Sequence, residues 1–151
     1  MKKQILTLAL LLTVGLSSVF ANNEEGISSR ATASFKKEFT QAKEVKWETG
    51  KEFVKATFQM NDQVMFAYYT PAGDLLAVTR NIVSSQLPFS LIADLKNNHK
   101  DSWITDLFEI AANGETTYYV TLENSDATVV LKSEGVAGWE QFKKDKKSTV
   151  Q

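Results

Sequence analysis

The chain has 151 residues, with 17 basic and 18 acidic side chains, one histidine and no cysteine. The lack of cysteine excludes disulfides, thiol nucleophiles and thiolate metal sites, and a single histidine disfavours zinc and iron sites. Charge-driven nucleic-acid binding is excluded as well, because only Arg30 and Arg80 occur and no basic stripe is present.

The first 21 residues have the pattern of an export signal. Lys2 and Lys3 precede an apolar run, and Val19-Phe20-Ala21 carries small or apolar residues where a signal peptidase reads. The run is shorter than the roughly 20 residues that span a bilayer. We predict a signal peptide over 1–21, a disordered N-terminus over 22–27, no membrane span after cleavage, and a periplasmic or secreted location. The mature chain has 15 basic residues, 17 less two, against 18 acidic ones, a net charge of −3.

Residues 28–82 are predicted to form a first helix-plus-meander repeat. Ala31, Phe35 and Phe39 recur at i, i+4 and i+8, which predicts an amphipathic helix over 28–42. The period then changes to two, and Gly73 is expected to supply the positive φ of a turn. With turns at 49–50, 61–62 and 71–74, the strands are expected at about 45–48, 52–60, 63–70 and 74–80.

Residues 83–140 are predicted to form the second repeat. Leu87, Leu91 and Leu95 give a second apolar stripe, and Pro88 is tolerated in a first helical turn. The strands are expected at about 103–111, 116–122, 127–132 and 136–139, with turns at 113–114, 124–125 and 135. Residues 141–151 are expected to form a basic C-terminal tail, either a solvated terminus or a contact for a membrane surface or an anionic polymer.

The two repeats share a constant spacing. Phe35, Phe39 and Trp47 precede Leu91, Leu95 and Trp103 by the same 56 residues. Fixed-period similarity indicates duplicated structural units. We therefore predict an α+β fold, a tandem repeat of helix plus four-stranded antiparallel meander, forming one sheet of up to eight strands with helices on one face. Trp47 and Trp103 are expected to fill the core.

Turn position decides which side chains face the helices. A two-residue turn at Asn61-Asp62 places Phe58 opposite Met65, Ala56 opposite Ala67 and Val54 opposite Tyr69, on the helix-covered face. Lys55, Phe66 and Tyr68 then face the other way, as does Tyr119 when the turn of the second repeat lies at Asn124-Ser125. This helix-free face is either an ordinary solvated surface or a binding platform. The parity of 103–110 stays open, since one bulge would reverse it.

Catalytic patterns are not found. His99 ends the second helix without a carboxylate or serine arranged as a relay, which favours a structural role at a helix C-terminus. There is no phosphate-binding glycine loop, nucleophile elbow or calcium loop, and no carboxylate pair stands out by its spacing. We expect no enzyme activity, metal or cofactor.

Several strings resemble a known family. Phe35-Lys36-Lys37-Glu38-Phe39, Val45-Lys46-Trp47-Glu48, the strand 53–58 and Tyr69-Thr70-Pro71-Ala72-Gly73-Asp74-Leu75-Leu76 resemble the PepSY-like, beta-lactamase-inhibitor-like family of exported bacterial proteins. The resemblance covers about 34–139 and implies a tandem helix-plus-meander protein with a long antiparallel sheet. The inhibitor grips its target with a concave sheet and hairpin loops, one of which carries an acidic side chain, and Asp62 sits on a comparable turn. The inhibitor's disulfides and surrounding motifs are absent, so inhibition of beta-lactamase is not carried over.

These observations predict an exported, non-catalytic binding protein. Its ligand is expected to be a protein or peptide on the open sheet face, contacted by Lys55, Phe66, Tyr68 and Tyr119. One alternative is an envelope protease or enzyme inhibitor, or a chaperone-like protein, that uses the hairpin tips around Asp62 and Asn124. The other is a carrier of a small apolar ligand, which requires a closed pocket between helices and sheet.

Overall fold

The computed structural model describes residues 26–147. The predicted signal peptide and its cleavage site lie outside these residues, and only Gly26 and Ile27 of the predicted disordered segment lie within them. Ile27 packs against the core below the first helix, so the expectation of disorder is wrong at this position. No helix of the described part is long and apolar enough to cross a membrane.

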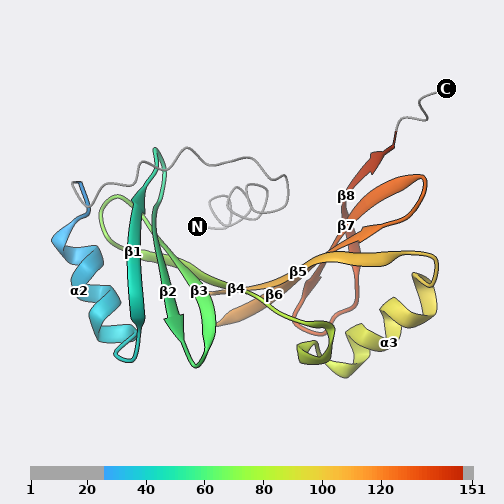
Figure 1. Cartoon of the computed structure of the whole chain (residues 1–151), viewed down its shortest axis with the longest axis horizontal. Helices are drawn as coiled ribbons and strands as arrows, with labels where there is room; N and C mark the ends of the chain where they lie inside the picture. The colour runs from blue at the N-terminus through green and yellow to red at the C-terminus, as the bar shows by residue number, and fades with distance from the viewer. Residues whose placement is uncertain (1–25, 148–151) are drawn as a thin grey trace. The chain divides into compact units, whose positions relative to one another are not determined.

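Eight strands follow chain order, β1 to β8, in one sheet. The described residues divide into two compact units, 26–80 (unit 1) and 81–147 (unit 2). Each unit contains one α-helix followed by a meander of four strands, coloured blue to green in unit 1 and yellow to red in unit 2 (Figure 1). Strand pairings within each unit are antiparallel. The predicted α+β tandem fold is confirmed.

Unit 1 begins with α2, Ser29–Glu38, and continues with β1 (Lys43–Thr49), β2 (Val54–Met60), β3 (Gln63–Tyr69) and β4 (Leu75–Asn81). The hydroxyl of Ser28 caps α2 by accepting from Ala31 N at 3.1 Å, which satisfies one of the free N–H groups of the first turn. Gly73 has φ +97°, as expected, and a Cβ there would lie 2.6 Å from Ala31 N. The β3–β4 turn therefore packs directly against the start of α2.

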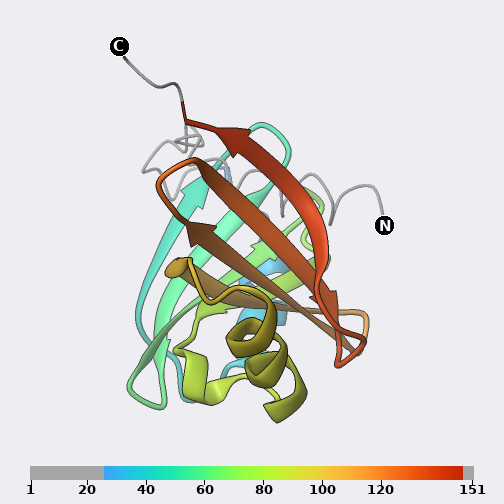
Figure 2. The ribbon, with the colours of Figure 1, turned by 90° about the vertical axis from the view of Figure 1, so that its right-hand side faces the viewer.

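Unit 2 contains a 3-10 turn (Ser84–Gln86), α3 (Phe89–Asn98), β5 (Trp103–Ala112), β6 (Glu115–Glu123), β7 (Ala127–Glu134) and β8 (Glu140–Lys146). Figure 2 looks onto this unit, with α3 and the strands β7 and β8 nearest the viewer. The last strand was expected at 136–139, with a tail from 141. That expectation is wrong, since residues 140–146 pair with β7 despite their charge. A strand at the end of a sheet tolerates charged side chains that a central strand excludes.

The pairing register of each hairpin is set by the position of the turn between its two strands. Asn61 and Asp62 both have positive φ, 52° and 59°, and the predicted pairs Phe58–Met65, Ala56–Ala67 and Val54–Tyr69 are all present. The turn between β6 and β7 lies one residue later than expected, because Asn124 N donates to Ala127 O and leaves Ser125 and Asp126 as the two turn residues. Pairing shifts by two residues, so Val120 and Leu122 still face α3 as predicted.

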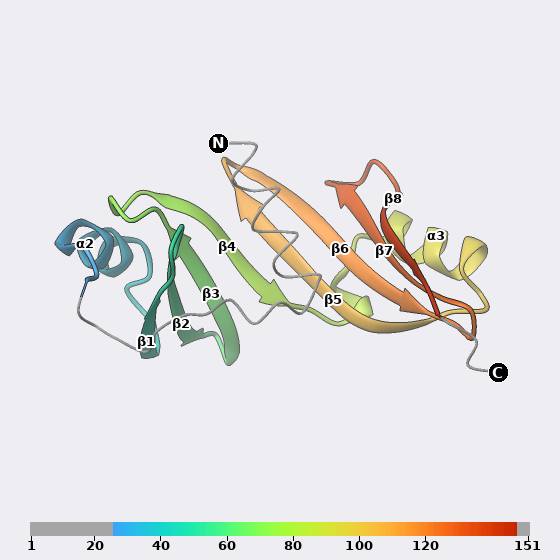
Figure 3. The ribbon, with the colours of Figure 1, turned by 90° about the horizontal axis from the view of Figure 1, so that it is seen from above.

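Each helix covers one face of its own meander, as α2 does for unit 1 in Figure 3. The core of unit 1 joins Phe35 of α2 to Phe58 and Tyr69 of the strands. Trp47 packs edge-on against Phe35 with ring centroids 5.4 Å apart, which confirms it as a core residue. Trp103 is 54% exposed, so the same expectation is wrong for Trp103.

Trp139 takes the core position in unit 2. Its indole lies against the cluster formed by Leu87, Leu91, Leu95 and the strands. The open parity of 103–110 is settled by a bulge between Ile104 and Asp106, which turns Leu107 toward α3 and Phe108 away from it.

Candidate functional site

The helix-free face of unit 1 carries two adjacent rows of side chains. One row crosses the strands β1 to β4 as Lys46, Thr57, Phe66 and Thr79, and the next as Glu48, Lys55, Tyr68 and Ala77. None of them belongs to the cluster beneath α2. The predicted residues Lys55, Phe66 and Tyr68 are therefore brought together on one surface, named here the unit 1 face.

Lys55 is held at the centre of the unit 1 face. Its Nζ lies 2.5 Å from Glu48 Oε2 and 5.9 Å from the centroid of the Phe66 ring. The side chains of Lys55 and Glu48 are only 17% and 29% exposed. A half-buried ammonium beside a carboxylate and above a ring has little rotational freedom left, so its position is fixed before any partner arrives.

Tyr68 supports this arrangement from below. Burial raises the pKa of Tyr68 to about 12, the negative charge of Glu48 raises it further, and a hydrogen bond with the Thr79 side chain acts in the opposite direction. The hydroxyl is therefore protonated at neutral pH and can donate as well as accept. Thr79 itself is 3% exposed.

The helix-free face of unit 2 carries three aromatic rings, named here the unit 2 aromatic row. Phe108 and Tyr119 stack with centroids 5.2 Å apart and planes 10° from parallel, and Phe142 meets Tyr119 edge-on at 5.4 Å. Burial raises the pKa of Tyr119 to about 12, and the charge of Glu134 adds to the effect. The cluster beneath α3 includes none of the three rings.

Exposure separates the predicted contact residues. In the whole chain Tyr68 is 4% and Tyr119 is 2% exposed, so the expectation that these two rings stand free on an open surface is wrong. Lys55 and Phe66 keep intermediate exposure, and Asp62 is exposed at the β2–β3 hairpin tip. Neither described helix covers the two tyrosines, because α2 and α3 pack on the opposite face of their units.

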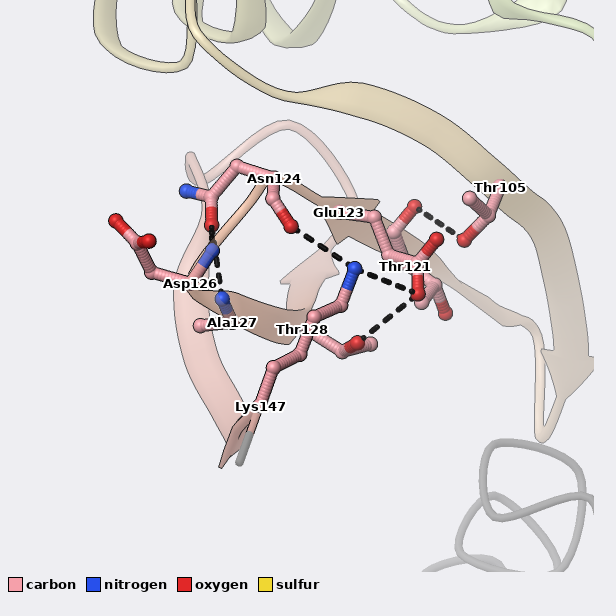
Figure 4. Close-up of polar contacts among 8 residues, drawn as sticks. All are labelled: Thr105, Thr121, Glu123, Asn124, Asp126, Ala127, Thr128 and Lys147. Atoms are coloured by element: carbon pink, nitrogen blue, oxygen red, sulfur yellow. Dashed lines mark hydrogen bonds and ion pairs between the residues drawn. The ribbon is translucent and has the colours of Figure 1, made fainter. Parts of the chain in front are cut away.

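The β6–β7 tip is occupied by internal contacts (Figure 4). Asn124 Oδ1 accepts from the backbone N–H groups of Asp126 and Ala127, both at 2.9 Å. Lys147 Nζ donates to Asn124 O at 2.9 Å and lies 5.6 Å from the Trp103 ring centroid. The polar groups of Asn124 therefore serve the turn itself, which disfavours this tip as a contact for a target enzyme.

A separate groove lies between α2 and β1, named here the edge groove. Its volume is about 540 Å³, and it is lined by Ile27, Thr32, Phe35, Lys36, Phe39, Thr40, Ala42, Val45 and Trp47. From the sequence, the aromatic residues of this lining were expected only as core residues. The groove could not be read from periodicity, since it depends on how far α2 lies from the end strand of the sheet.

The described residues offer no metal-binding arrangement. No group of three or more His, Asp or Glu side chains within 26–147 could hold a metal ion. His99 is the C-cap of α3, and its backbone N–H donates to Leu95 O at 3.0 Å, whereas the structural role of its imidazole stays a prediction. Asp106 is half-buried and accepts a backbone hydrogen bond from Leu107, with desolvation raising its pKa.

Comparison with known proteins identifies the fold. No family model and no curated protein sequence matches the chain. Among solved structures, it shares the fold of the BLIP-like and DUF2874 proteins of Bacteroides. The BLIP-like protein of Bacteroides fragilis has a TM-score of 0.71 and 17% identity over 82% of this chain and 90% of its own. A DUF2874 family protein of Bacteroides ovatus has a TM-score of 0.68 and 12% identity over 78% and 86%.

A third neighbour, from Bacteroides eggerthii and provisionally described as periplasmic, has a TM-score of 0.67 and 11% identity over 79% of this chain and 88% of its own. The expected inhibitor-like fold is confirmed by these neighbours. The PepSY part of the resemblance stays a prediction. At such identities a shared fold carries no activity with it.

Proposed function

We propose that the chain is an exported, non-catalytic binding protein of the periplasm that recognises a protein or peptide through the unit 1 face. The fold shared with BLIP-like and periplasmic proteins supports this class of function. The apolar export signal predicted from the sequence supports the location.

The observation that carries the proposal is the position of Lys55. A lysine in a soluble protein usually extends into water, whereas Lys55 is held between the Glu48 carboxylate and the Phe66 ring. A charged side chain already ordered in the free protein loses little entropy on binding. The unit 1 face therefore has the fixed polar centre and adjoining aromatic surface that protein contacts use.

Binding would proceed by complementarity at this centre. An apolar side chain of the partner covers the exposed part of Phe66, beside the ordered ammonium group of Lys55. Thr57, which lies between Lys46 and Phe66 in the same row, adds a hydroxyl that donates or accepts. Tyr68 holds the floor of the site without contacting the partner.

The alternative function, carrying a small apolar ligand in a closed pocket between helix and sheet, is disfavoured in unit 1. The space between α2 and the sheet is filled by the rings of Phe35, Phe39 and Phe58, whose centroids lie 4.8 to 5.1 Å apart. Such packing leaves no enclosed room for a small apolar molecule. The edge groove lies at the side of this core and is open.

Affinity capture tests the proposal. The mature chain, residues 22–151, is used as bait in periplasmic extract beside Phe66→Ala, Lys55→Met and the control Phe89→Ala, an 84% exposed ring on α3. We expect one partner to bind the wild type and the control equally and both unit 1 variants at least roughly tenfold more weakly, since an aromatic anchor contributes about 2 kcal/mol. Equal capture by all four folded proteins would refute the proposal.

A further inference from the structure

The edge groove has the geometry of a peptide-binding cleft. Its apolar wall consists of Phe35 from α2 and Phe39, the C-cap of that helix, and its floor consists of Val45 and Trp47 from β1. Phe39 and Trp47 are only partly buried, although both touch the core. A helix beside the edge of a sheet, with apolar side chains between them, is the arrangement that accepts an extended peptide as an added strand.

The strand beside the groove has a free side in the described part of the chain. β1 stands first in the sheet order and pairs only with β2 among the strands of 26–147. A bulge interrupts β1 between Lys43 and Lys46, where Glu44 has φ 52°, and the strand is regular over Lys46–Thr49, which can hydrogen-bond a short extended peptide. A strand edge presents unpaired N–H and C=O groups, which is a ready template for another extended chain.

Charge around the edge groove favours an acidic occupant. Lys36 is the charged residue in its lining, and none of the ion pairs found among the described residues includes Lys36 or Lys43. Glu38 and Glu44 accept hydrogen bonds from the neutral side chains of Ser34 and Gln59 and keep their negative charge, but neither of them lines the groove. Within the groove an incoming carboxylate therefore meets the ammonium group of Lys36.

We propose that the edge groove of unit 1 binds an extended peptide that adds to β1, placing an apolar side chain against Phe39 and Trp47 and an acidic side chain near Lys36. In an extended peptide, residues two apart face the same side, so an apolar residue followed two positions later by Glu or Asp matches the groove. The site is separate from the unit 1 face, because its lining residues lie on the α2 side and edge of the sheet.

A labelled peptide of sequence Thr-Val-Thr-Phe-Thr-Glu-Thr tests the proposal by fluorescence anisotropy on the mature chain, with a matched peptide carrying Lys in place of Glu. We expect Lys36→Glu to weaken binding of the acidic peptide roughly tenfold and to strengthen binding of the Lys peptide. Lys37→Glu, on the same helix but outside the groove lining, should leave both affinities unchanged. Phe66→Ala should also leave them unchanged, which separates this test from that of the proposed function.

Two further peptides, N-methylated at residues 2, 4 and 6 or at 3, 5 and 7, test the strand pairing itself. Successive amides of a strand point to opposite edges, so one methylated peptide should bind like the parent and the other should lose binding. Amide hydrogen exchange of 43–49 should slow with the parent peptide. Equal binding of acidic and basic peptides, equal behaviour of the two methylated peptides, or a micromolar dimer that excludes the peptide would each overturn the proposal.

Discussion

Trp139 Nε1 donates a hydrogen bond to the backbone carbonyl of Leu91, 48 residues earlier and on α3, at 3.0 Å. The indole thereby ties the segment before β8 to the helix of the same unit. Trp103, which stands 56 residues after the core residue Trp47, is instead exposed beside Lys147. The tryptophan that matters for unit 2 packing is therefore not the one that the repeat spacing indicates.

Replacing the two tryptophans should separate their roles. Trp139→Ala should lower the free energy of unfolding by about 3 kcal/mol, since it removes a large side chain from the core contact and leaves a cavity. Trp103→Ala should lower it by about 0.5 kcal/mol, the size of an exposed cation–π contact. Urea unfolding followed by circular dichroism measures both. A larger loss for Trp103→Ala would show that the assigned packing is incorrect.

Gly73→Ala should destabilise the protein more than Gly114→Ala. Both glycines have positive φ, 97° and 78°, and so share a backbone cost of about 1 kcal/mol for a side chain. Only at Gly73 would the added Cβ meet neighbours, at 2.6 Å from Ala31 N and 2.7 Å from Ser28 Oγ. Thermal unfolding of the two variants gives the comparison. Equal losses would mean that the turn does not press on the start of α2.

Asp106→Asn should stabilise the protein at neutral pH. Desolvation raises the pKa of Asp106 in the folded state, so the ionised form is disfavoured there relative to the unfolded chain. The contribution of the native carboxyl to stability is thus fully present below its unfolded pKa and is lost as pH rises through the folded value. Asn keeps the acceptor for Leu107 N. The melting temperature of the variant should exceed that of the wild type at pH 7 and equal it at pH 3, and a lower value at pH 7 would reveal a stabilising partner for the charge.

Removal of C-terminal residues tests whether residues 140–146 stabilise unit 2 as a strand or are a dispensable tail. Removing residues 140–151 deletes the strand that pairs with β7 and the Phe142 ring that contacts Tyr119. Unit 2 should then lose its cooperative unfolding transition, whereas removal of 148–151 alone should leave it unchanged. Hydrogen exchange in β7 reports the difference. If exchange in β7 is the same in both truncated proteins, residues 140–146 are dispensable and β8 does not stabilise the unit.

The sequence predicted those features that depend on local pattern. The stripe of Phe35 and Phe39, the two-residue turn at Asn61-Asp62 and the parity of β2 and β3 were all accessible, because helix period and turn chemistry act over a few residues. The faces of the β6 side chains were predicted correctly although the turn position was not, because a shift of two residues in the pairing keeps every side chain on its face.

What the sequence did not predict depends on contacts across long separations. Residues 140–146 carry five charged side chains, a composition typical of a solvated tail, and only their pairing with β7 makes them a strand. The bulge before Asp106 decides which side of β5 faces α3, yet a bulge has no fixed residue signature. The ordering of Lys55 between Glu48 and Phe66 requires three strands in register, so it appears only in the folded unit.

Photo-cross-linking tests the binding role of the unit 1 face most directly. A benzoylphenylalanine placed at position 66, and in a second protein at the exposed position 89, is irradiated in cells that export the protein, and the adducts are identified by mass spectrometry. We expect one recurrent partner to be cross-linked at position 66, to be absent at position 89, and to be reduced when Lys55 is replaced by Met. Adducts confined to position 89, or the same adducts at both positions, would contradict it.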